Sequence, residues 1–122
     1  GDHLELLQAG KEIAPIVQIE AIQSEPVTTK PFGATTPPEM KLELRRSAQP
    51  LLKPFRQESN LQTLMVAAYD QTGNVVEAWQ LNRAWASKES VTEAIVKGTL
   101  RPVLIVTFVA ASITVVPPSE FP

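Results

Sequence analysis

Residues 64–116 constrain the fold of this chain most, because their pattern predicts consecutive strands joined by a tight turn. Residues 61–69 and 75–81 are apolar runs on either side of a polar segment that contains Gly73 and Asn74. Both turn residues tolerate a positive φ, so we expect the two runs to pair as an antiparallel hairpin. A β-rich protein is therefore the starting prediction.

The longest uncharged run, residues 102–119, follows this hairpin. A membrane-spanning helix needs about 20 apolar residues. This run is shorter, contains Thr107, Ser112 and Thr114, and is rich in β-branched side chains. It therefore predicts buried strands with a bend near residues 110–112, and no membrane span.

A short helix is predicted between the hairpin and that last apolar run. Ser90 and Glu93 have the spacing of a capping box, and Gly98 is placed where a helix would end. Because so short a helix must dock to persist, we expect Val91 and Ile95 to pack against the sheet.

The first half of the chain predicts further strands. Residues 13–22 are β-branched with polar alternate positions, and residues 40–44 lie in the cleanest period-two pattern of the chain. Residues 24–38 hold four of the eleven prolines and predict an extended loop. The expected fold is α+β and mainly antiparallel: one domain over residues 1–122, with a small sheet or open barrel and one or two short helices.

A second short helical piece is expected after residues 40–44. Ser47 is a suitable cap, and Leu51, Leu52 and Phe55 are predicted to share one side. Pro50 and Pro54 limit this piece to a turn or two.

The residues offer little chemistry for catalysis. There is no Cys, one His at position 3 and two Asp, so neither a thiolate, a metal site nor a catalytic triad is indicated. The glycines are scattered and form no phosphate-binding loop. We expect no catalytic, cofactor-binding or metal-binding residues, and no enzyme activity. The net charge of −2 argues against a nucleic-acid partner.

Residues 69–87 resemble an element of contractile-tail phage tail-tube proteins. In that family a strand ends in an acidic or Gly turn, a second strand follows, and an aromatic corner leads through a loop to a last strand. Here Trp85, Ala86 and Ser87 stand at the corner and residues 103–109 form the last strand. The resemblance implies a non-enzymatic structural protein in a virion or in the host cytoplasm.

The mechanism that the resemblance implies is assembly: protomers close into a six-fold ring, and rings stack into a conduit. Its partners would be copies of itself or other tail proteins. Open sheet edges are natural templates for such contacts. The interface residues implied are Trp85, Phe32, Lys41, Glu43 and Arg45.

An alternative is a periplasmic adaptor or peptide-binding module. The sequence is also similar to the carboxy-terminal domain of energy-transducing envelope proteins, in which a short helix with alanine precedes the final strand. Ala94 and Ile95, followed by Leu100, Arg101 and Pro102, carry this likeness. A tail protein should self-assemble, whereas an adaptor should bind an extended peptide on a sheet edge.

Overall fold

A computed structural model describes residues 2–29 and 33–121 of the chain. Most of these residues are in strands. In chain order the elements are β1 (His3–Gln8), β2 (Lys11–Gln23), β3 (Val27–Thr29), β4 (Ala34–Thr36), β5 (Glu39–Arg45), the 3₁₀ helix η1 (Arg46–Phe55), β6 (Gln62–Tyr69), β7 (Val75–Val96), β8 (Thr99–Val109), β9 (Ser112–Val115) and the 3₁₀ turn η2 (Pro118–Glu120).

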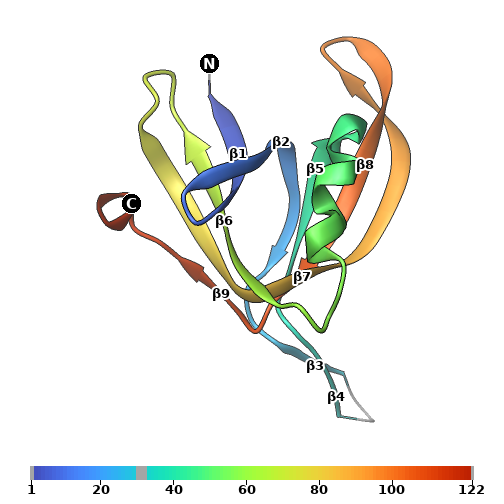
Figure 1. Ribbon diagram of the computed structural model, residues 1–122, viewed down its shortest axis with the longest axis vertical. Helices are drawn as coiled ribbons and strands as arrows, with labels where there is room; N and C mark the ends of the chain where they lie inside the picture. Colours follow the sequence, from blue (N-terminus) through green and yellow to red (C-terminus); the bar gives the residue numbers. More distant parts are fainter. Residues whose placement is uncertain (1, 30–32, 122) are drawn as a thin grey trace.

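Antiparallel pairing joins seven strands of the described chain into one sheet, in the order β6-β1-β2-β5-β8-β7-β9. Strand β6 also pairs with β7, so the sheet curls round into a partial ring (Figure 1). Strands β3 and β4 form a separate small pair at the end of the long β2–β5 arm. The predicted fold class, mainly antiparallel β with short helices, is confirmed.

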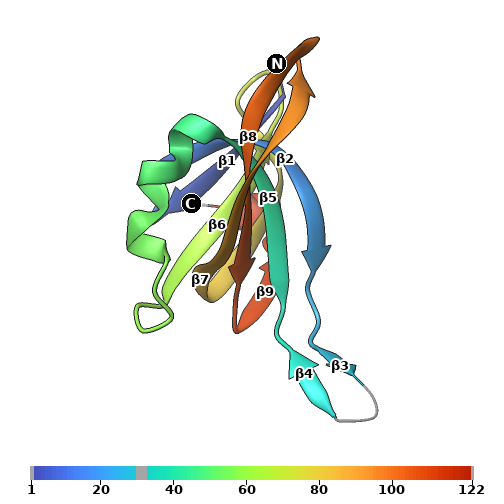
Figure 2. The same cartoon turned by 90° about the vertical axis from the view of Figure 1, so that its right-hand side faces the viewer.

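The core lies inside the curled sheet. Alternate residues of β5 face their register partners on β8, and all of them are fully buried: Met40, Leu42, Leu44, Leu104, Val106 and Phe108. Helix η1 lies against one side of this sheet (Figure 2), and its Leu52 and Phe55 belong to the same core cluster. Burying each such side chain contributes about 1.5–3 kcal/mol, so this cluster holds β5, β8 and η1 together.

Helix η1 is longer than the predicted turn or two, and its cap is not Ser47. It spans ten residues, begins after Arg45 and has no side-chain cap. Side chains three residues apart eclipse one another in a 3₁₀ helix, which brings Leu52 and Phe55 to the core side. Leu51 is exposed, so the prediction that it shares that side was wrong.

The predicted helix over residues 90–97 is also wrong, because β7 continues as a strand to Val96. Its second half pairs with β8, and Val96 lies opposite Thr99 across a turn in which Lys97 and Gly98 have φ values of 52° and 77°. Ile95 is 76% exposed and does not dock on the sheet as expected. The β-branched residues of this segment favour a strand, and the cross-strand partners of β8 outweigh the local capping pattern.

Other predictions of strand positions hold. Strands β2, β5 and β6 and the start of β7 match the expected runs, and the hairpin turn lies between Tyr69 and Val75. The bend between β8 and β9 is confirmed, with the Ala111 amide donating to the Asn82 carbonyl at 2.8 Å. Strand β1 was not predicted, and the Pro-rich loop contains β3 and β4. No helix in residues 2–29 or 33–121 is long and apolar enough to cross a membrane.

Candidate interface face

One surface of the sheet brings together most of the predicted interface residues. The side chains of β5 that alternate with the core residues point away from the core, together with their register partners on β8 and β7. We call this surface the outer face. It consists of Glu39, Lys41, Glu43, Arg45, Val103, Ile105, Thr107, Val109, Trp85, Lys88, Ser90 and Thr92.

Four of the five predicted residues share the outer face, although they come from two strands. Lys41, Glu43 and Arg45 follow one another along β5, and Trp85 on β7 lies opposite Val109 of the intervening strand β8. The fifth, Phe32, lies outside the described residues.

Exposure differs sharply among these charged side chains. Lys41 and Arg45 are exposed, but Glu43 is only 6% exposed, contrary to the expected charged surface. Burial raises the pKa of the Glu43 carboxyl, and the charge and hydrogen bond of Glu20 raise it further. Burial and the neighbouring Glu20 therefore make the Glu43 carboxyl harder to ionise than an exposed glutamate.

The tryptophans occupy different environments. Trp79 is half-buried and packs against the main core cluster. Trp85 is also half-buried, but it is on the outer face beside Val109 and belongs to neither core cluster of the described residues. Part of its ring is therefore available for a contact outside the chain.

Among the unpaired strand edges of the described chain, two belong to its longest strands, β7 and β2. Beyond Ala84, β7 has β8 as its only strand partner, and beyond Ile16, β2 has only β5. The β7–β8 hairpin projects past the rest of the sheet (Figure 1) and exposes Ile95 beside Leu100. Sequence reasoning missed this feature because the helix prediction fell on the same residues.

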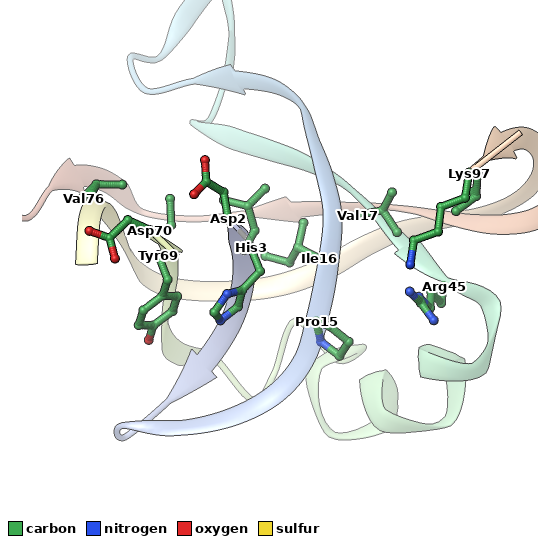
Figure 3. Close-up of a pocket in the computed structure, with 13 residues that line it drawn as sticks. Asp2, His3, Pro15, Ile16, Val17, Arg45, Tyr69, Asp70, Val76 and Lys97 are labelled. Carbon is green, nitrogen blue, oxygen red and sulfur yellow. The ribbon is translucent and has the colours of Figure 1, made fainter. Parts of the chain in front are cut away.

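An open cavity of about 700 Å³ lies at the end of the partial ring from which this hairpin projects. Figure 3 shows His3, Tyr69 and Asp70 on one wall, and Arg45 and Lys97 on the other. The His3 and Tyr69 rings stack with centroids 4.8 Å apart, and His3 Nε2 lies 2.7 Å from Glu5 Oε2. Burial raises the pKa of the Tyr69 hydroxyl.

The described residues do not form a metal centre. In residues 2–29 and 33–121 no group of three or more His, Cys, Asp or Glu side chains is placed to hold a metal ion. The arrangement consists of sheet edges, an outer face and charged walls, all of which suit contacts with other chains.

Comparison of the sequence finds no matching family model and no matching curated protein. Comparison of the structure does find neighbours. A chain of the extended sheath–tube complex of the extracellular contractile injection system PVC has a TM-score of 0.60 at 8% identity, over 95% of this chain and 88% of that chain. The PVC sheath/tube terminator gives 0.59 at 10% identity, over 94% and 92% respectively.

The tube-terminating cap of the anti-feeding prophage is a further neighbour, with a TM-score of 0.58 at 12% identity over 93% of this chain and 87% of that chain. The protein thus has the fold of tube and cap proteins of contractile injection systems. The resemblance to contractile-tail tube proteins is confirmed at the level of this fold. The predicted corner at Trp85, Ala86 and Ser87 is wrong, because these residues lie inside strand β7.

Proposed function

We propose that this protein is a non-enzymatic protomer of a contractile-tail tube or of a tube-associated ring. The observation that carries the proposal is the likeness of fold to tube and cap proteins over nearly the whole chain. Copies would close into a ring, six-fold in our proposal, and rings would stack into a conduit.

The open edges give this assembly a physical route. An unpaired strand edge presents amide and carbonyl groups that a strand of another chain can pair with. A ring requires two different surfaces on each protomer, because each copy contacts its two neighbours through opposite flanks. The edges of β7 beyond Ala84 and of β2 beyond Ile16 supply two such surfaces.

The outer face supplies side-chain contacts in this proposal. Trp85 would act as the anchor, because a partly exposed indole beside Val109 buries a large area when a partner covers it. Lys41, Glu43 and Arg45 would extend the contact along β5, with Lys41 nearest to Trp85. Phe32 would add an apolar contact.

We place the working protein in a virion or a related contractile particle, after synthesis in the host cytoplasm, with copies of itself and other tail proteins as partners. The adaptor alternative is not proposed, because it relied on a helix containing Ala94 and Ile95. Both residues belong to strand β7.

Light scattering across a concentration series of the purified chain tests the proposal. We expect species larger than a monomer that grow with concentration. Trp85→Ala should weaken self-association about tenfold or more with little change in thermal stability. Trp79→Ala is the matched control: it should lower the melting temperature first, because Trp79 packs on the core cluster. A chain that is strictly monomeric at every concentration would overturn the proposal.

A further inference from the structure

A second cavity, of about 510 Å³, lies between the tip of the projecting β7–β8 hairpin and the start of η1, and is strongly basic. Four of the eleven basic side chains of the protein line it, and no carboxylate does. These side chains are Arg45, Arg46, Lys97 and Arg101. The ion pairs found in the described residues, His3–Glu5 and Arg56–Glu89, do not involve them. We call this site the basic cavity.

The opposite flank of the same end is acidic. Asp70, in the turn between β6 and β7, and Asp2, just before β1, lie on the far wall of the larger cavity (Figure 3). Neither takes part in an ion pair within the described residues. We call these two residues the acidic flank.

Asp70 is held in place as an anion. Its Oδ1 accepts hydrogen bonds from the Thr72 hydroxyl at 2.7 Å, the Thr72 amide at 2.9 Å and the Asn74 amide at 3.0 Å. These bonds, that of the Thr72 side chain first, lower the pKa of Asp70. The turn thus presents a fixed, partly exposed carboxylate.

The two charged regions stand on opposite flanks at one end of the molecule: the β6–β7 turn on the left and the β7–β8 tip on the right of Figure 1. Surfaces at the same height on opposite flanks meet when copies are arranged in a ring whose axis is parallel to this long axis. We propose that the basic cavity of one copy faces the acidic flank of the next copy around the ring.

This inference rests on the proposed function and adds the chemistry of the contact. A second copy suits the basic cavity better than a nucleic acid does. Binding a single strand without sequence preference usually combines a basic groove with stacking aromatic side chains. The basic cavity has no aromatic residue in its lining, and the whole chain carries a net charge of −2.

Exposed charge pairs mainly accelerate association and select orientation, and salt screens them. We therefore expect self-association of the wild-type chain to weaken about tenfold between 50 mM and 500 mM NaCl. The unpaired strand edges would still permit assembly at high salt.

Charge variants test the contact by light scattering and sedimentation at low salt. Arg46→Glu with Arg101→Glu should weaken self-association about tenfold or more. Asp70→Asn should weaken self-association less, because it neutralises one charge and reverses none. Asn keeps a carbonyl acceptor for the turn, so the turn should stay folded. Adding Asp2→Lys to Arg46→Glu should restore part of the association that Arg46→Glu alone removes.

Lys53→Glu is the matched control, since Lys53 is an exposed cation outside the basic cavity. Thermal melts of all variants establish that each is folded. If the wild-type chain never associates, the proposed function itself fails. If the wild-type chain associates equally at low and high salt, and the Arg46/Arg101 variant associates as strongly as Lys53→Glu, only this inference fails. Binding of a labelled oligonucleotide that the Arg46/Arg101 variant loses would assign the cavity to a polyanion and also overturn it.

Discussion

The ion pair between Arg56 and Glu89 gives a sharp test of how η1 is attached to the second half of β7. Arg56 Nε donates to Glu89 Oε2 at 2.6 Å and its Nη2 donates to Oε1 at 3.0 Å, so the contact is bidentate. Nη2 also donates to the Gln49 carbonyl at 2.9 Å. The pair therefore ties the end of η1 to a strand that the sequence predicted to be a helix.

The strength of the Arg56–Glu89 ion pair depends on how far its two side chains are exposed to solvent. The side chains of Arg56 and Glu89 are 36% and 16% exposed, so the pair lies between a surface ion pair and a buried one. Exposed pairs contribute about 0.2–1 kcal/mol, and breaking a buried pair costs about 3–5 kcal/mol. Allowing for screening by solvent at Arg56, we expect a coupling energy of about 1–1.5 kcal/mol.

A double-mutant cycle in urea measures this coupling. The variants are Arg56→Met, which keeps much of the apolar stem, Glu89→Gln, and both together. Each single change should lower the urea midpoint by about 0.5–1 M, and the second change should add little once the first is made. Raising the NaCl concentration should reduce the coupling only in part, because Glu89 is mostly covered.

The control is Glu93→Gln, four residues further along the same strand. Glu93 is exposed and forms no ion pair within the described residues, so its change should stay within about 0.5 kcal/mol. A coupling below about 0.3 kcal/mol, or an equal loss in Glu93→Gln, would refute the assignment of Arg56 and Glu89 as a joint that holds η1 to β7.

Three further predictions concern stability. Glu43→Gln should stabilise the protein at pH 7, because it removes an ionised carboxyl whose pKa the fold raises; this advantage should shrink as the pH falls through the raised pKa and disappear below the usual value near 4.5. Urea unfolding at several pH values measures it, and a constant advantage at all pH values would contradict the stated cause. Gly98→Ala should lower the free energy of unfolding by about 1 kcal/mol, because Gly98 has a φ of 77°. The added methyl meets no atom within 4 Å, so backbone strain alone causes this loss. Lys97→Gly relieves a φ of 52° and should not lower the melting temperature. Leu104→Ala should cost about 2–5 kcal/mol in urea unfolding, since Leu104 is fully buried opposite Leu44; a loss below about 1 kcal/mol would show that the core collapses around the gap.

Local signals in the sequence predicted the parts of the fold that depend on neighbouring residues. The turn at Gly73 and Asn74 fixes the β6–β7 hairpin, and the strict alternation from Met40 to Leu44 identifies the buried side of β5. These features could be predicted because a turn type and a period-two pattern are contained in fewer than about ten residues.

The remaining features depend on residues far away in the sequence. The capping pattern of Ser90 and Glu93 is local, but pairing with β8 overrides it. Burial of Glu43 could not be predicted from β5 alone, because it requires β2 and β8 on either side. Strand β1 is short and is stabilised by pairing with both β2 and β6. For the candidate interface, the sequence indicated residues of the outer face but not the projecting hairpin.

The length of β7 has a mechanical consequence. This single strand of 22 residues pairs with β6 and β9 in its first half and with β8 in its second half. Hydrogen bonds in antiparallel sheets run perpendicular to the strands, so a pull along the strand loads many of them in shear at once. Eleven register pairs join β7 to β8, so the two strands of this hairpin move together. A force applied to the hairpin tip would therefore load in shear the ladders that hold β8 to β5 and β7 to β6 and β9, and would reach the far side of the protomer through β7.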